Sequence, residues 1–145
     1  MYYVNHEQID VRLAFIPALT KACRELEAAW AAEAAEPGLL LHLAQERTLI
    51  LAIETVTDVG SLLIDAFMMR DASSYEDIVD ILAGEGVIEA STAGVLRELV
   101  GLRRTLTQEY TSLERSGLHP MVPRLPQRLE AFAERVPAFI RKEVI

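Results

Sequence analysis

The residues best suited to chemistry in this sequence lie in the stretch from Arg103 to Tyr110. Within it, Arg103, Gln108 and Tyr110 offer a guanidinium, a carboxamide and a phenol. On a helix, Arg103 and Tyr110 would lie two turns apart and share one face. A guanidinium carries paired N–H donors that match the oxygens of a phosphate or a carboxylate. The stretch is therefore predicted to contain an anion-binding site.

Gln108 limits the catalysis that this stretch could perform. A carboxamide donates and accepts hydrogen bonds, but it does not exchange a proton near neutral pH. General acid or base catalysis, worth about 10²- to 10⁴-fold, would therefore be missing at this position. Gln108 could still orient phosphate or water. Glu109 could act as a base if burial raised its pKa, although an exposed carboxylate on a helix is more often only solvated.

Arg103 also falls in the apolar seam of a predicted helix, between leucines at positions 96, 99, 106 and 113. A buried arginine without an anion would be costly, so a carboxylate partner is expected. Glu54 and Asp58 are candidates because they share a polar stripe with Ser61 and Asp65 on an earlier predicted helix. We expect Arg103 to pair with Glu54 or Asp58. Such a pair could be only a structural link between two helices.

The arginines around this stretch are the only predicted contact for a polyanion. The chain carries a net charge of −8, so its overall field repels nucleic acid. A local cluster of Arg97, Arg103 and Arg104, doubled by a dimer axis, could still bind RNA phosphate. Arg104 could instead be an ordinary surface charge that faces Gln108 one turn along the helix.

Two blocks of the sequence resemble the HepT-like branch of the HEPN proteins. The string Arg103-x4-Gln108-x-Tyr110 is similar to the Arg-x4-His-x-Tyr signature of that branch, with glutamine in place of histidine. Residues 58–71 and 74–78 are similar to its second-helix and turn region. The resemblance is strongest to the YutE-type subgroup, which also tends to carry glutamine there, and it extends over nearly the whole chain.

The resemblance implies a fold and a shared site. The fold would be an all-α, antiparallel HEPN-type bundle of about five helices, dimeric, with the signature helices of two subunits lining one cleft. In active HepT-like toxins this cleft cleaves RNA without metal. Arg103 matches the arginine that holds phosphate, and Gln108 stands where a histidine would handle the proton. Tyr110 matches the tyrosine to which a partner nucleotidyltransferase of the MNT type transfers AMP.

These residues leave three functions open. The chain could be a ribonuclease toxin, active or weakened, that an MNT-type antitoxin neutralises. It could instead be a non-catalytic dimer that binds a nucleotide, RNA or a partner protein through the cleft. In the third interpretation, Tyr110 serves chiefly as an acceptor of AMP. The residues expected to support the site are Glu54, Asp58, Arg104 and Glu109.

Helices are expected to position these residues within one domain, 1–145. Apolar residues at three- and four-residue spacing predict helices over residues 7–33, 39–69, 74–82, 91–113 and 126–142. Ser73 or Ser74 is expected to cap the third helix, and Ser91 or Thr92 the fourth. No segment alternates as a strand would.

Composition narrows the class of protein further. The hydrophobic share of 51% favours a homodimer that covers part of the apolar surface. Cys23 is the only cysteine, so an internal disulfide and a thiolate metal site are excluded, and a core thiol is expected. His6, His42 and His119 lie in different segments, so no metal or cofactor is predicted. Because neither a signal peptide nor an apolar span is found, the predicted location is the cytoplasm.

Overall fold

The computed structural model describes residues 2–32 and 38–144. Its α-helices are α1 (His6–Ala32), α2 (Leu39–Ala66), α3 (Tyr75–Gly84), α4 (Ala90–Val100), α5 (Arg103–Gln108) and α6 (Leu125–Val144). Two 3-10 turns, η1 (Tyr110–Ser112) and η2 (Val122–Arg124), follow α5 and precede α6. The described ranges contain no strand, and five of the helices have ten residues or more. This confirms the predicted all-α bundle of about five helices.

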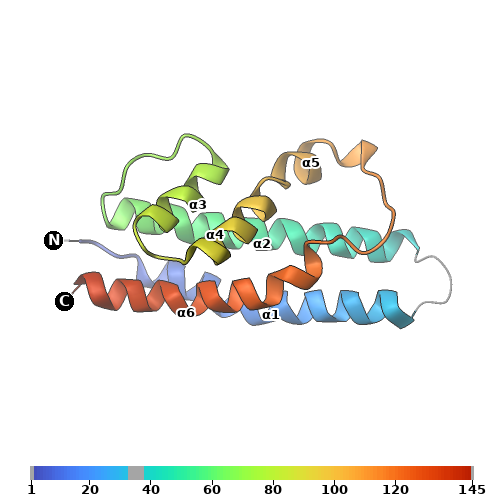
Figure 1. Cartoon of the computed structure of the whole chain (residues 1–145), viewed down its shortest axis with the longest axis horizontal. Coiled ribbons are helices and arrows are strands. Elements are labelled where there is room, and N and C mark those ends of the chain that lie inside the picture. Colours follow the sequence, from blue (N-terminus) through green and yellow to red (C-terminus); the bar gives the residue numbers. More distant parts are fainter. Residues whose placement is uncertain (1, 33–37, 145) are drawn as a thin grey trace.

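The two longest helices form the frame of the molecule. α1 and α2 lie side by side in opposite directions, and α6 packs along α1 (Figure 1). At about 1.5 Å per residue, helices of 27 and 28 residues are each about 40 Å long. α3, α4 and α5 all pack against α2. The predicted end of the first helix, at residue 33, lies outside the described residues.

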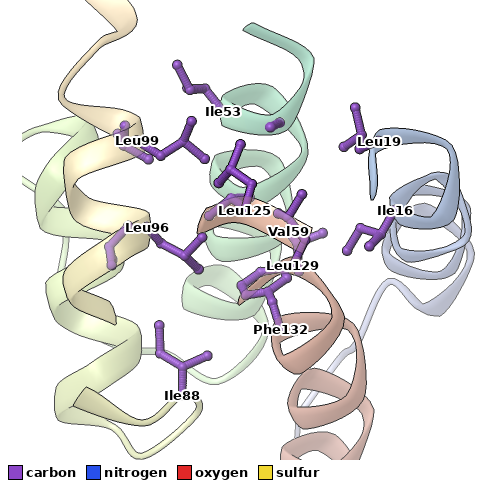
Figure 2. Packing of buried hydrophobic residues seen from close by; sticks show 14 of the residues in the cluster. Ile16, Leu19, Ile53, Val59, Ile88, Leu96, Leu99, Leu125, Leu129 and Phe132 are labelled. Carbon is purple, nitrogen blue, oxygen red and sulfur yellow. The ribbon is translucent and has the colours of Figure 1, made fainter. Parts of the chain in front are cut away.

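The core fills the space between these helices with aliphatic and aromatic side chains. Figure 2 shows residues of α1, α2 and α4 converging on α6: Ile16, Leu19, Ile53, Val59, Leu96, Leu99, Leu125, Leu129 and Phe132. Phe132 is fully buried, and so is Cys23, as expected of a core thiol. Burial raises the pKa of Cys23 to about 11. Among the described helices, none combines the length and the apolar character needed to cross a membrane.

α2 and α3 approach each other closely at Gly60. A Cβ atom added to Gly60 would overlap Cγ2 of Ile78. The missing side chain therefore lets the backbone of α2 lie directly against the side chains of α3. This contact holds α3, whose first residue is Tyr75, close to α2.

The chain between α4 and α5 corrects the prediction of one helix over residues 91–113. α4 ends at Val100 and α5 begins at Arg103. The amide of Gly101 donates to the carbonyl four residues back, whereas that of Leu102 donates three residues back, to Leu99. This tighter bonding turns the chain, and glycine weakens a helix interior by about 1 kcal/mol relative to alanine.

The predicted helix caps have different outcomes. At α3, Oγ of Ser74 accepts from the amide of Asp77 over 3.1 Å, which confirms one of the two expected caps. At α4 the prediction of Ser91 or Thr92 is wrong. The helix begins one residue earlier, after Glu89, and no side chain caps it.

α2 ends in an unusual residue, Met68, whose φ of 54° lies in the left-handed region. The amide of Met69 donates to the carbonyl of Ile64 over 3.0 Å, as in a Schellman motif, where glycine usually takes the place of Met68. The side chain of Met68 is 80% exposed. Little packing therefore offsets the backbone strain at this position.

Candidate functional site

Arg103 is held by two side chains from different helices. Its Nε donates to Oε1 of Glu54 on α2 over 3.3 Å. Its Cζ lies 4.0 Å from the centre of the Tyr75 ring at the start of α3. The side chain of Arg103 is 27% exposed. Of the three guanidinium nitrogens of Arg103, Nε is the one with a hydrogen-bond partner within residues 2–32 and 38–144. Both Nη atoms are therefore available to an anion.

Of the two carboxylates predicted for Arg103, Glu54 is the partner. Asp58, one turn further along α2, instead accepts from Nε of Arg12 on α1 over 3.0 Å. Nη1 of Arg12 donates to the carbonyl and side-chain oxygens of Gln8. A hollow of about 210 Å³ opens beside this group of residues. Asp58 therefore links α2 to α1 and does not contribute to holding Arg103.

Arg12 contacts Asp58 in the polar stripe of α2, and Tyr75 contacts Arg103. Neither residue was predicted from the sequence to belong to the site. Arg12 left a signal, because it lies three residues after Ile9 and four before Ile16, beside the apolar stripe of α1. Tyr75 left none, since its contact with Arg103 depends on how α3 packs on α2. The Tyr75 residue is 43% exposed and follows the N-cap of α3 directly.

A polar network fixes the turn that precedes α3. Asp77 accepts hydrogen bonds from Nη1 and Nη2 of Arg70 over 2.7 and 2.8 Å. It also accepts from the amide and the hydroxyl of Ser73 over 2.9 and 3.1 Å. The hydrogen bonds from Arg70, above all, hold the pKa of Asp77 well below its usual range. Because Ser74 in turn binds the amide of Asp77, the backbone on both sides of Tyr75 is tied down.

Each of the three arginines in the predicted cluster has a carboxylate of its own. Arg97 precedes the break between α4 and α5, and its Nε donates to Asp80 of α3 over 3.0 Å. Its charge is therefore met within another pair of helices. Arg104 is an exposed surface charge, as one of the two predictions had it, and its Nε lies 3.7 Å from Oε2 of Glu109. Of the three, Arg103 is the member that contacts Glu54.

Gln108 and Glu109 lie at the end of α5, and both are exposed. The burial that a proton-transferring Glu109 would require is not present. The amide of Glu109 donates to the carbonyl of Arg104 over 3.3 Å, which closes the helix. The end of α5 therefore presents a carboxamide and a carboxylate to solvent.

Tyr110 lies in η1 and not on a helix face shared with Arg103. That prediction is wrong because α5 ends at Gln108. Tyr110 is 56% exposed, and its carbonyl accepts from Nη2 of Arg115 over 3.3 Å. Arg115 also donates two hydrogen bonds to Glu46 of α2, over 2.7 and 2.9 Å. The backbone of Tyr110 is thereby tied to α2, while its side chain remains accessible.

The loop after η1 is fastened to the first half of α2 by His42 and Gln45, a set of contacts here called the loop anchor. Nε2 of His42 accepts from the amide of Gly117 over 3.1 Å, and its Nδ1 lies 3.2 Å from the carbonyl of Gly38. Because a carbonyl only accepts, the geometry assigns a neutral imidazole with its proton on Nδ1. Gln45 binds the carbonyl of Gly117 and the amide of His119 over 3.1 and 2.7 Å.

Trp30 and His119 complete the surroundings of the loop anchor. The Trp30 ring lies edge-on to His42, with centroids 5.2 Å apart. Nδ1 of His119 accepts from the amide of Met121 over 3.0 Å, and burial lowers the pKa of His119. His42 and His119 thus meet at one loop as hydrogen-bond acceptors. In the part of the chain that the structure describes, no three His, Cys, Asp or Glu side chains gather as they would around a metal.

The sequence and the fold both relate this chain to known proteins. Residues 19–136 match the family described as Ribonuclease HepT-like. This chain belongs to that family. A Bacillus subtilis protein named "Putative RNase YutE" is 31% identical over 144 residues, which cover 99% of this chain and 95% of the relative. The expected membership of the HepT-like branch is confirmed.

Solved structures agree with this HepT-like assignment. The structure of YutE from Bacillus subtilis, described as a cytosolic protein of unknown function, has a TM-score of 0.82 at 29% identity, over 99% of this chain and 95% of that one. A tri-AMPylated Shewanella oneidensis HEPN toxin in complex with MNT antitoxin has a TM-score of 0.71 at 18% identity, over 90% and 96%. The second likeness shows the HepT-like fold alone.

Proposed function

We propose that this chain is a dimeric HepT-like protein that binds RNA phosphate at Arg103 and has lost most of the cleavage activity. The observation that carries the proposal is the state of the Arg103 guanidinium. Glu54 binds its Nε, and both Nη atoms are without a partner among the described residues. Paired N–H groups of this kind suit two oxygens of one phosphate. The family match and the name of the Bacillus subtilis relative support RNA as the ligand.

Gln108 limits the rate at which this site can cleave RNA. Attack by the 2'-hydroxyl of RNA on the adjacent phosphorus requires a group that accepts the hydroxyl proton, and departure of the leaving oxygen requires one that supplies a proton. The carboxamide of Gln108 can hold either oxygen by a hydrogen bond, but it cannot transfer the proton. Glu109 is exposed beside Arg104 and is not placed to replace it. The site therefore binds phosphate with slow turnover.

The test compares RNA cleavage by the native chain and by Gln108→His, both in EDTA. We expect the native chain to cleave about 10²- to 10⁴-fold more slowly than Gln108→His, because that variant regains a proton carrier. Arg103→Ala should abolish cleavage in the Gln108→His background. Arg141→Ala removes an exposed arginine near the end of α6 and serves as the matched control. Cleavage that survives the loss of Arg103 in that background would exclude the proposed site.

Tyr110 supports a second function, as an acceptor of AMP from an MNT-type nucleotidyltransferase. The supporting observation is the combination of an accessible side chain with a backbone held by Arg115. Incubation with ATP, Mg²⁺ and such an enzyme should add the mass of AMP to the native chain. Tyr110→Phe should prevent the addition, whereas Tyr3→Phe, which alters another exposed tyrosine, should not. Labelling that persists in Tyr110→Phe would exclude Tyr110 as the acceptor of AMP.

The homodimer is supported by apolar side chains that lie exposed on α1. Val11 and Phe15 are one helical turn apart, and both are exposed. Light scattering should give the mass of two chains for the native protein and of one chain for Val11→Glu/Phe15→Glu. A native monomer at micromolar concentration would contradict the dimer.

We place the protein in the cytoplasm, in line with the description of YutE as cytosolic, and cell fractionation tests this.

A further inference from the structure

Tyr75 has no role in the function proposed above, yet it makes a close contact with Arg103. The guanidinium carbon of Arg103 lies 4.0 Å from the centre of the Tyr75 ring. Attraction between a cation and an aromatic face is significant within about 6 Å. The two residues come from α5 and α3, so the contact exists only in the folded protein.

The ring is carried by a backbone segment that is fixed on both sides. Before Tyr75, Asp77 binds the amide and the hydroxyl of Ser73, and Arg70 locks the carboxylate from the other side. After Tyr75, α3 is held against α2 at Gly60, where a side chain would overlap Ile78. The backbone that carries the ring is therefore set by α2 and α3 and does not depend on Arg103.

Glu54 and Tyr75 hold different parts of the guanidinium. Glu54 takes the Nε–H, a single contact that leaves the plane free to turn about that hydrogen bond. Tyr75 supports the flat face, which restricts this rotation. An aromatic face attracts the cation without accepting an N–H group in the way that a second carboxylate would. The two Nη atoms are thus held in place and left open to a ligand.

We propose that Tyr75 is a positioning residue that holds the Arg103 guanidinium with its Nη atoms directed toward a phosphate group of bound RNA. The inference rests on the proposed function of Arg103 and adds a second residue to the same site. The group that holds the guanidinium is the ring of Tyr75 and not its hydroxyl. Phenylalanine should therefore replace tyrosine, whereas leucine, similar in bulk but without an aromatic face, should not.

The expected effects are modest and specific. The loss of an exposed or partly exposed cation–π contact should weaken binding of a labelled oligouridylate roughly two- to fivefold in Tyr75→Leu. Tyr75→Phe should bind as the native chain does. Thermal unfolding should be unchanged in Tyr75→Phe and should shift only slightly in Tyr75→Leu, which loses this one contact at a residue that is 43% exposed. Tyr3→Leu removes a more exposed tyrosine elsewhere and controls for a general loss of aromatic surface.

A double-mutant cycle with Arg103→Ala separates positioning from direct stacking on a base. Binding is measured by fluorescence anisotropy in EDTA for the native chain, Tyr75→Leu, Arg103→Ala and the double variant. If Tyr75 acts through Arg103, Tyr75→Leu has no further effect once Arg103 is alanine. An equal loss in both backgrounds would mean that the ring contacts RNA itself, and it would overturn the positioning role.

The cycle also distinguishes failure of this inference from failure of the proposed function. If Arg103→Ala binds as the native chain does, the phosphate site at Arg103 is wrong, and the positioning role falls with it. If Arg103→Ala loses binding but Tyr75→Leu does not, the phosphate site stands and only the role of Tyr75 is overturned. The NMR signal of the Arg103 Nε–H gives a second readout, since its ring-current shift should persist in Tyr75→Phe and disappear in Tyr75→Leu.

Discussion

Arg103 differs from the other ion-paired arginines around α2 in how much of its guanidinium is occupied. Arg115 uses Nε and Nη2 on Glu46, and Arg12 uses Nε on Asp58 and Nη1 on Gln8. Arg103 uses Nε alone among the described residues. Two parallel hydrogen bonds give an ion pair its strength and its fixed geometry. The Arg115–Glu46 pair therefore has the form of a structural link, whereas Arg103 keeps the donors that a phosphate requires.

His119 should make the loop anchor sensitive to acid. Burial lowers the pKa of His119 in the folded chain, so below about pH 6.5, the ordinary value, the unfolded chain binds more protons. The contribution of His119 to stability is complete above that pH and is lost as the pH falls through the lowered pKa. His119→Asn keeps an acceptor for the amide of Met121 without a titrating group.

The measurement is the thermal unfolding temperature of the native chain and of His119→Asn between about pH 7 and pH 5. Carboxylates such as Asp77, whose pKa is lowered by folding from an ordinary value near 3.8, stay ionised in both states over this range and add little to the change. The native chain should fall more steeply over this range. A steeper fall in His119→Asn would contradict the assignment of His119 as a neutral acceptor.

At the scale of elements, α2 carries most of the polar contacts that position the site. Its first half holds the loop anchor through His42 and Gln45, and its middle binds Arg103 and Arg12 through Glu54 and Asp58. Its last turns lie against α3 at Gly60. The segment from α5 to α6 is therefore positioned by contacts with one long helix and not by contacts with its own neighbours in sequence.

The end of α2 gives a prediction about stability. Met68 adopts a left-handed backbone conformation, which costs an L-residue about 1–2 kcal/mol and costs glycine almost nothing. Glycine also increases the entropy of the unfolded chain, which offsets part of the gain. Met68→Gly should therefore stabilise the fold by roughly 0.5–1 kcal/mol, as measured by urea unfolding. Met68→Ala keeps the strain and should not, and a destabilised Met68→Gly would mean that the exposed side chain has a partner.

The sequence predicted some of these elements well and others poorly, for physical reasons. The spacing of Glu54 and Asp58 placed them on one face of α2, because helix geometry fixes neighbours three and four residues apart. The same rule extended the signature helix past Gly101, since apolar periodicity continues there although the backbone does not. The Tyr75 contact depends on tertiary packing between α2 and α3, which no local pattern encodes. The loop anchor was missed for the same reason, as His42 and Gly117 meet only in the fold.

At the scale of the whole molecule, the charge of the chain opposes the ligand proposed for it. Acidic residues outnumber basic ones by 22 to 14. The field around the molecule therefore repels RNA, and a single arginine per chain has to attract one phosphate locally. Because Arg97 and Arg104 are already paired with Asp80 and Glu109, few counterions should be released on binding.

This distribution of charge predicts a weak dependence of RNA binding on salt. For single strands, the slope of log K against log salt is about −0.7 for each phosphate neutralised. Two copies of Arg103 in a dimer should give a slope no steeper than about −1.4, and Arg103→Ala should bring it close to zero. Anisotropy titrations in KCl measure both values. A slope several times steeper would show that a broad basic surface binds RNA in place of this site.

Trp30 is the only tryptophan of the chain, and its place beside His42 makes it a built-in optical probe. Its indole nitrogen is buried against the loop that follows η1, close to Gly117. If that loop left α2, the indole would meet water and its emission would shift to longer wavelength. The fluorescence of the unlabelled protein can therefore report whether the segment next to Tyr110 stays docked while RNA or a nucleotidyltransferase is added.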